Sequence, residues 1–162
     1  MIVVADTGPL YYLALIGQAD VLGLLYTHVL VPTAVAQEMR QDATPAVIRS
    51  WISQPPDWIE IRTDPSPDPA LSWLDAGESA AISLALALGV ERILIDDWDG
   101  RVEAVRRHLR VTGTLGVLVL AHRRGLLDFE TALARLSQTN FYLSAELVRL
   151  VRRRLAGGIE EP

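Results

Sequence analysis

Short apolar runs alternate with longer segments of helical periodicity along most of the chain. Residues 2–5, 28–31 and 92–95 are runs in which nearly every side chain is apolar, as in strands that are buried on both faces of a parallel sheet. The segments between them carry helix signals, such as a proline in the first turn or a glycine after the last turn. This alternation predicts an α/β fold, with a parallel sheet of four or five strands between helices in a three-layer α/β/α arrangement.

The pattern predicts a specific order of elements. Strands are expected at residues 2–5, 28–31, 92–95 and 109–111, with a short edge segment at 59–61. Helices are expected at residues 7–16, 19–25, 33–39, 45–53, 75–88, 100–108, 115–124, 128–137 and 144–155. We expect a single domain over residues 1–155, followed by a flexible tail at 156–162.

Composition narrows the chemistry that is open to this fold. The chain has 162 residues, of which 50% are hydrophobic, so it can bury a core as one domain of ordinary size. It contains no cysteine, and all 15 of its basic residues are arginine. These absences exclude disulfides, thiolate zinc sites, cysteine nucleophiles, P-loop lysines and Schiff-base lysines. No apolar stretch is long enough to cross a membrane, and we expect a cytoplasmic protein without a membrane partner.

The net charge of −5 conceals an uneven distribution. Residues 1–100 carry 14 acids and 4 arginines, whereas residues 101–162 carry 6 acids and 11 arginines. This division suggests cation binding at one end and a polyanion at the other. Arg149, Arg152 and Arg153 share one helical face and are the candidate backbone-binding surface. Charge alone favours the alternative that arginine-rich helices are solvated on one side.

Acidic residues follow the ends of two predicted strands. Asp6 follows the run at 2–5, and the run at 92–95 is followed by Asp96, Asp97 and, two residues later, Asp99. In open α/β sheets, ligands bind beyond the carboxyl ends of the strands. Because a parallel βαβ fold tends to make these two strands neighbours, we expect their acids to lie side by side.

Two predicted helices add Glu38 and Glu78, but each acid also has a structural explanation. Asp6 and Asp99 could cap helices, and Glu38 could lie on a solvated face. Asp75 and Glu78 have the spacing of a capping box. Together these explanations are strained, because carboxylates about 4 Å apart repel by roughly 4 kcal/mol at an effective dielectric of 20. Such a cluster must bind a proton, an arginine or a metal, and Mg²⁺ suits it.

Four segments in order resemble the PIN domain, the metal-dependent nuclease fold of the VapC toxins of prokaryotic toxin–antitoxin pairs. The segments are Val3–Thr7, Val31–Glu38, Glu78–Ala85 and Ile95–Asp99. The chain resembles a poorly characterised prokaryotic subgroup of PIN-like proteins more closely still. The segments that carry this resemblance are Leu74–Glu78, Leu94–Asp97 and Gly113–Leu118. The resemblance extends from Met1 to about Gly125.

The resemblance implies a metal-dependent endoribonuclease, toxin-like, that hydrolyses RNA with a metal-activated water. It implies Mg²⁺ or Mn²⁺ as cofactor, bound by Asp6, Glu38, Glu78 and Asp97, with Asp99 farther from the metal. A small antitoxin protein and a homodimer are implied by the resemblance only. The chain departs from the family at Glu78, where Asp is commoner, and at Ile95, where the toxins often carry Thr.

The adjacent acids Asp96 and Asp97 are not expected to contribute equally, because successive side chains of a strand point to opposite faces. Periodicity does not choose between them. The family's last strand commonly ends in an acid, one spacer and a second acid, which matches residues 97–99. This register makes Asp97 the metal ligand and leaves Asp96 to hydrogen-bond backbone or to pair with an arginine.

Four neighbours of these acids are further candidates, each with an alternative. Thr7 and Thr114 could orient water or substrate, although each also suits the start of a helix. Arg101 could meet a phosphate or form a salt bridge. Trp98 could stack a base, although packing beside the core strand is favoured.

Two other functions stay open at this point. A catalytically silent PIN-like module would bind RNA or a protein without cleaving anything. A receiver- or phosphatase-type phosphotransfer domain would also use Mg²⁺ and carboxylates at strand ends. The missing lysine and the spread of acids over helices argue against the second of these functions.

Overall fold

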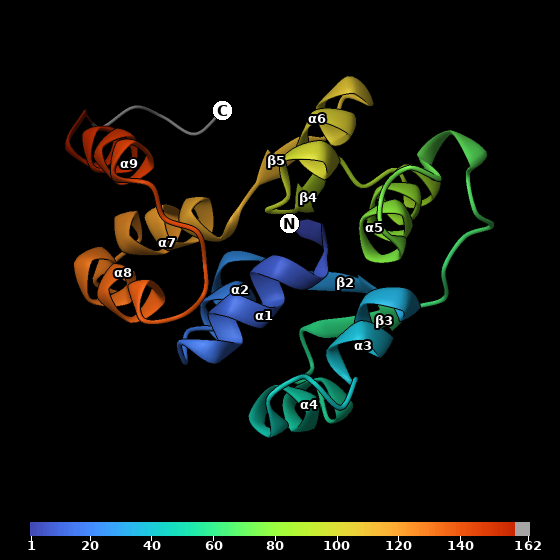
Figure 1. Ribbon diagram of the computed structural model, residues 1–162, viewed down its shortest axis with the longest axis horizontal. Coiled ribbons are helices and arrows are strands. Elements are labelled where there is room, and N and C mark those ends of the chain that lie inside the picture. The colour runs from blue at the N-terminus through green and yellow to red at the C-terminus, as the bar shows by residue number, and fades with distance from the viewer. Residues whose placement is uncertain (158–162) are drawn as a thin grey trace. The chain divides into compact units, whose positions relative to one another are not determined.

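The structure, a computed structural model, describes residues 1–157. The chain divides into two compact units, Met1–Thr114 and Leu115–Pro162. The first unit contains the sheet, and the described part of the second is helical (Figure 1). Most of the predicted flexible tail, at 158–162, lies outside the described residues, and residues 156–157 belong to the last helix. A single domain over residues 1–155 stays a prediction.

The first unit is built on a five-stranded sheet in which every strand pairing is parallel. Its strands are β1 (Ile2–Ala5), β2 (His28–Pro32), β3 (Ile59–Arg62), β4 (Arg92–Leu94) and β5 (Arg110–Thr112). Their order in the sheet is β3-β2-β1-β4-β5. The predicted α/β fold and the neighbouring places of β1 and β4 are therefore confirmed. From β1 the chain first adds β2 and β3 on one side and then crosses over to add β4 and β5 on the other side. The crevice at such a switch point, here between β1 and β4, is where α/β folds bind ligands.

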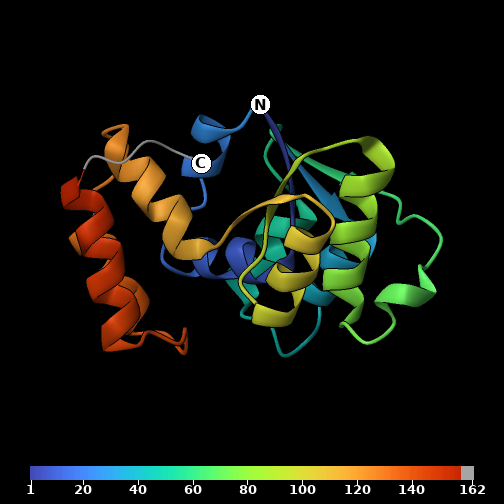
Figure 2. The same ribbon diagram turned by 90° about the horizontal axis from the view of Figure 1, so that it is seen from above.

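Helices cover the sheet. They are α1 (Thr7–Leu15), α2 (Val21–Leu25), α3 (Thr33–Met39), α4 (Ala46–Ser53), α5 (Ala76–Leu88) and α6 (Trp98–Arg106), with a short 3₁₀ turn, η1 (Pro69–Leu71). Val4, Leu30 and Ile93 lie in register and form one core with Ile82 of α5 and Ala104 of α6, and these two helices lie side by side (Figure 2). The alternate strand residues point to the opposite face and are equally buried, which gives the three layers.

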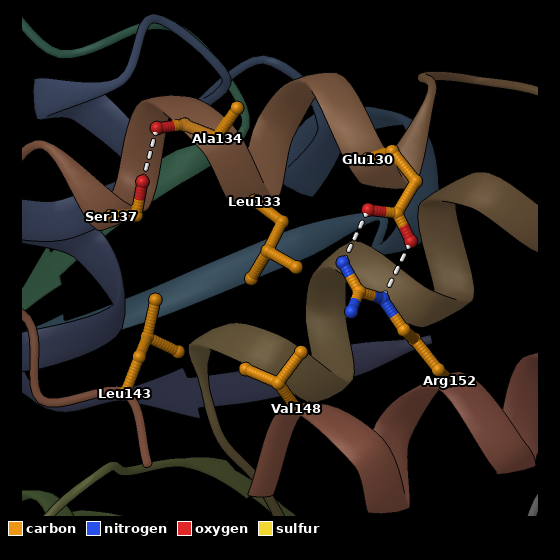
Figure 3. A pocket seen from close by; sticks show the side chains of 7 residues that line it. All are labelled: Glu130, Leu133, Ala134, Ser137, Leu143, Val148 and Arg152. Carbon is orange, nitrogen blue, oxygen red and sulfur yellow. Dashed lines mark hydrogen bonds and ion pairs between the residues drawn. The ribbon is translucent and has the colours of Figure 1, made fainter. Parts of the chain in front are cut away.

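The second unit is described as three helices, of which α7 (Thr114–Arg123) begins at the unit boundary. The others are α8 (Phe129–Ser137) and α9 (Ala145–Gly157). A groove between α8 and α9 has an apolar floor that includes Leu133 and Val148, and Glu130 and Arg152 are joined across it (Figure 3). Among the described residues, no helix combines the length and the apolar character that a membrane span needs.

The start of α6 differs from the predicted one for a physical reason. The helix was expected from Gly100, with Asp99 as its cap, but it begins at Trp98. Asp97 is the capping residue, because its Oδ1 accepts a hydrogen bond from the backbone N–H of Asp99 at 3.0 Å. Three acids in four residues can all serve as a cap, and sequence alone does not decide which one does.

Candidate functional site

Asp6 lies where β1 ends beside β4. Its backbone N–H donates to the carbonyl of Leu94 at 2.9 Å, so β1 and β4 deliver their following residues to the same edge of the sheet. Asp6 occupies the N-cap position of α1, yet its side chain makes no capping hydrogen bond. The carboxylate is only 7% exposed. The structural explanation of Asp6 as a helix cap therefore does not account for its side chain.

Glu38 approaches Asp6 from α3. Its Oε2 accepts a hydrogen bond from the Thr7 hydroxyl at 2.8 Å, which orients the carboxylate. Both carboxylates lie against Gly77 in the first turn of α5: a Cβ at that position would be 3.0 Å from Asp6 Oδ1 and 3.1 Å from Glu38 Oε2. A side chain at Gly77 would thus push into the space between these two acids.

Glu78 and Asp75 complete the group, which we call the acidic cluster (Asp6, Glu38, Asp75 and Glu78). The capping box is present: Asp75 Oδ1 accepts from the Glu78 N–H at 2.8 Å, and Glu78 Oε2 accepts from the Asp75 N–H at 3.4 Å. The second bond is longer than the usual range, so it constrains Glu78 weakly. The Glu78 side chain is 5% exposed and lies against the start of α6, where a Cβ on Gly100 would be 3.4 Å from its Cδ.

The protonation of Asp6 reflects this crowding. Burial raises the pKa of the Asp6 carboxyl to about 7, although the nearby backbone N–H of Thr7 acts in the opposite direction. The negative charges of Asp75, Glu38 and Asp96 raise the pKa further. Asp6 therefore holds a proton well above the ordinary range of a carboxylic acid.

Glu78 is perturbed in the same way. Burial raises the pKa of its carboxyl to about 8, and the charges of Asp75, Asp97 and Asp6 add to the shift. Within residues 1–157, no arginine forms an ion pair with Asp6, Glu38 or Glu78. The acids of this cluster thus repel one another without a cation among the described residues, and either a proton or a bound cation relieves that repulsion.

Asp96 and Asp97 have different surroundings, although they are adjacent. Asp96 accepts two hydrogen bonds from Thr114, one from its N–H and one from its hydroxyl, both at 2.7 Å. Burial raises the pKa of Asp96, whereas the Thr114 bonds and the charge of Arg101 lower it. Arg101 also donates to the carbonyl of Ile95 at 3.1 Å. A Cβ on Gly113 would be 2.8 Å from Asp96 Oδ1, so Asp96 is closely enclosed.

Asp97, in contrast, is exposed and caps α6 while its charge acts on Glu78. Thr114 is fully buried and its hydroxyl donates to Asp96. In this geometry Thr114 holds Asp96 in place and has no surface for contact with water or a phosphate. Asp99 is exposed, one residue beyond Trp98.

The expectation that Trp98 packs beside the core strand is wrong. Its side chain is 74% exposed, because the chain has already left the strand and turned into α6 at this residue. Asp75 shows the opposite kind of error. Sequence reasoning took it only as a cap, but its charge raises the pKa of both Asp6 and Glu78. The sequence signal for this role of Asp75 is the spacing of the capping box, which brings its two acids close together.

The donor set fits a hard divalent cation, since it consists of carboxylate oxygens that are partly buried and lack a cationic partner in the described chain. The side chains as they stand are not gathered around one point. In the described part of the chain, no group of three or more His, Cys, Asp or Glu side chains is arranged to hold a metal ion. The acids are near one another, but Glu38, Asp75 and Glu78 are held by hydrogen bonds to Thr7 and within the capping box.

A family model described as a PIN domain matches residues 2–157. No curated protein matches the chain.

Proposed function

Because the chain belongs to the PIN-domain family, a family of nuclease-type domains that generally use divalent metals and act on RNA, we propose that it is a Mg²⁺- or Mn²⁺-dependent endoribonuclease. The observation that carries the proposal is the acidic cluster, in which Asp6 and Glu78 are buried carboxylates with raised pKa values and no arginine partner among the described residues. Ionised carboxylates in such buried surroundings destabilise the folded state at neutral pH, and a bound cation offsets this cost.

The proposed roles follow from the contacts of each residue. Asp6, Glu38, Glu78 and Asp97 would hold the metal, with Asp99 farther out. Thr7 fixes the carboxylate of Glu38 through its 2.8 Å hydrogen bond. When bound, a divalent ion polarises a phosphate and lowers the pKa of a water molecule on it. Glu78 would exchange its long contact with the Asp75 N–H, at 3.4 Å, for the cation.

Asp96 and Thr114 would support the site from behind. Their two hydrogen bonds join the end of β4 to the start of α7 and leave neither oxygen of Asp96 without a partner. Arg101, which donates to the Ile95 carbonyl, would steady the same turn and could also meet a phosphate. The buried proton on Asp6 would leave when the cation binds, so binding should strengthen as the pH rises towards 7.

A toxin-like role extends this proposal. It would include a small antitoxin protein, a homodimer and a cytoplasmic location, and its support is the resemblance of the sequence motifs to those of VapC toxins. A second candidate function is a silent module that binds RNA without cleaving it. That candidate is favoured by one observation, the absence of a ready metal-binding group among residues 1–157.

Cleavage of an end-labelled single-stranded RNA separates these functions. We expect fragments with Mn²⁺ or Mg²⁺ and none with EDTA. Asp6→Asn and Glu38→Gln should each lower the rate by at least about a hundredfold, which corresponds to roughly 3 kcal/mol of activation free energy. Asp20→Asn is the matched control, because Asp20 precedes α2 without a side-chain capping bond. Cleavage in EDTA, or by Asp6→Asn at the parent rate, would contradict the enzyme, and binding without cleavage would assign the silent module.

A further inference from the structure

Trp98 is the most exposed tryptophan side chain of the described residues, with 74% of its surface in solvent. Tryptophan is usually largely buried, because its indole contributes a large apolar area. Trp51 and Trp58 follow that rule, since their rings lie 6.2 Å apart and both residues are partly buried. An indole left in water therefore calls for an explanation other than the folding of this chain.

The position of Trp98 supplies the explanation. It is the first residue of α6, directly after Asp97 and directly before Asp99, both of which are exposed. The cap made by Asp97 fixes the backbone of this turn. Two residues further on, Gly100 lies so close to Glu78 that a Cβ there would be 3.4 Å from the Glu78 Cδ. The backbone of Trp98 thus follows Asp97, whose charge acts on Glu78, at a capped helix start, and the indole itself projects into solvent.

We propose that Trp98 stacks an unpaired base of the RNA whose phosphate lies at the acidic cluster. The inference rests on the proposed function, which brings a phosphate to these carboxylates through a divalent cation. A nucleotide carries its base beside its phosphate, so a phosphate at the cluster brings a base within reach of an adjacent side chain. An indole offers a flat apolar face to any base, which gives affinity with little sequence preference. Trp98 would therefore select unpaired RNA over a duplex, whose bases are already stacked on each other.

A protein partner is the alternative occupant, because Val102 and Val105 are exposed on the same helix at i+4 and i+7 from Trp98. The surroundings of Trp98 disfavour a protein, and the proposed cation at the cluster would offset the repulsion between the neighbouring carboxylates and RNA. The centre of a protein interface is depleted of charged residues, whereas Trp98 is bracketed by two exposed carboxylates. A stacked base leaves its edges and its phosphate in water and needs no dry apolar rim. Val105 distinguishes the two occupants, since a stacked base does not require it.

The test measures binding of the full chain to a short labelled single-stranded RNA by fluorescence anisotropy. Ca²⁺ replaces Mn²⁺, and a gel confirms that the RNA stays intact. A set of RNAs, each with one abasic position, is measured with the parent chain and with Trp98→Ala. We expect Trp98→Ala to weaken binding by roughly 5- to 100-fold. An RNA that is abasic at the stacked position should bind the parent chain more weakly by a similar factor. The same RNA should bind Trp98→Ala only slightly more weakly than the intact RNA does. Trp98→Phe should restore most of the affinity, and Val105→Ala should bind like the parent.

Several results would overturn the inference. They are a parent chain that does not bind the RNA, a Trp98→Ala variant with parent affinity, and an abasic penalty that is equal in parent and variant. Equal losses in Val105→Ala and Trp98→Ala, with a change of oligomeric state in light scattering, would assign the face to a protein partner instead. Because binding is measured without cleavage, a chain that stacks the base but leaves RNA intact in Mn²⁺ refutes the proposed function alone. Cleavage that is normal in Trp98→Ala on intact and abasic RNA refutes only the stacking.

Discussion

The acidic cluster of the first unit and the arginine-rich helix of the second carry their charges in opposite ways. In the first unit, Asp6 and Glu78 are 7% and 5% exposed and have no arginine partner within the described chain. In the second, Glu130 and Arg152 are joined by two hydrogen bonds of 2.8 and 2.9 Å while both side chains stay more than half exposed. Charges that are exposed and paired are stable without a further ligand. Buried and unpaired carboxylates are stable only with a proton or a cation, and they are the stronger indication of function.

The same contrast occurs within the first unit, between neighbours in the sequence. Asp96 has both oxygens engaged by Thr114, whereas Asp97 is exposed and acts on Glu78 through its charge. Asp97 uses Oδ1 as the cap of α6, whereas both oxygens of Asp96 are engaged. If a carboxylate oxygen that is not engaged by the described chain marks the reactive part of the site, then Asp97 belongs to that part and Asp96 to its support.

Asp97→Asn should lower Mn²⁺-dependent cleavage on the order of a thousandfold, about 4 kcal/mol of activation free energy, because a metal ligand is lost. Asp96→Asn should keep activity within about tenfold of the parent. Its amide can still accept from the Thr114 N–H and donate to the Thr114 hydroxyl. Cleavage rates of both variants decide the question, with circular dichroism to confirm that both are folded. An active Asp97→Asn beside an inactive Asp96→Asn would reverse the assignment.

Metal-free protein should lose stability as the pH rises from about 4 to 8. The pKa of Asp6 rises on folding to about 7 and that of Glu78 to about 8. A carboxyl whose pKa is higher in the folded state binds its proton more tightly there, so folding is favoured at low pH and this advantage is lost through the folded pKa. Asp6 alone should account for about 4 kcal/mol, since its pKa rises from 3.8 to about 7 and one pKa unit corresponds to about 1.4 kcal/mol.

Urea unfolding in EDTA at pH 5 and at pH 8 measures this loss of stability. Asp6→Asn should show a smaller loss than the parent, because only the contributions of Glu78 and Asp96 then remain. Glu130→Gln is the control and should match the parent, since Glu130 is exposed and paired. A parent chain that is as stable at pH 8 as at pH 5 would mean that the cluster is less repulsive than its geometry indicates.

A divalent cation should restore the stability that the repulsion removes. A ligand at about 100 times its dissociation constant stabilises the native state by about 2.7 kcal/mol, which for a chain of this size raises the Tm by roughly 5–10 °C. Differential scanning calorimetry at pH 7.5, in EDTA and in excess Mn²⁺, measures the shift. It should be smaller in Asp6→Asn and unchanged in Asp20→Asn. Equal melting temperatures of the parent in EDTA and in Mn²⁺ would contradict the proposed metal site.

The fold could be predicted well from sequence because each strand is a short apolar run and each helix has local start and stop signals. The strand at 92–95 and the capping box at Asp75 are examples of such signals, which are contained within a few residues. The placement of β4 beside β1 also followed, because parallel strands joined by helices tend to be neighbours. The family match to residues 2–157 agrees with that fold.

The site could be predicted only in part, because its details depend on contacts between distant residues. The pairing of Asp96 with Thr114 joins residues 18 apart, with α6 and β5 between them, and no periodicity reports it. The exposure of Trp98 depends on which of three nearby acids caps α6. The sequence predicted that the acids after β1 and β4 meet at one edge of the sheet, but it did not reveal which of them are hydrogen-bonded by the chain itself.

The smallest expected effect concerns the arginine face of α9, where Arg149, Arg152 and Arg153 line one hollow with Glu146. Three phosphate contacts to single-stranded RNA would add about 2.1 to the slope of log binding constant against log salt, at about 0.7 per contact. Arg152 is already engaged by Glu130, so only Arg149 and Arg153 should contribute. Replacing all three with Gln should therefore flatten the slope by about 1.4, and Arg152→Gln alone should leave it nearly unchanged. Anisotropy titrations of one RNA at several salt concentrations measure both slopes. If the slope does not change in the triple variant, this face is only solvated and does not bind RNA. A full change of about 2.1 would show that RNA displaces Glu130 from Arg152.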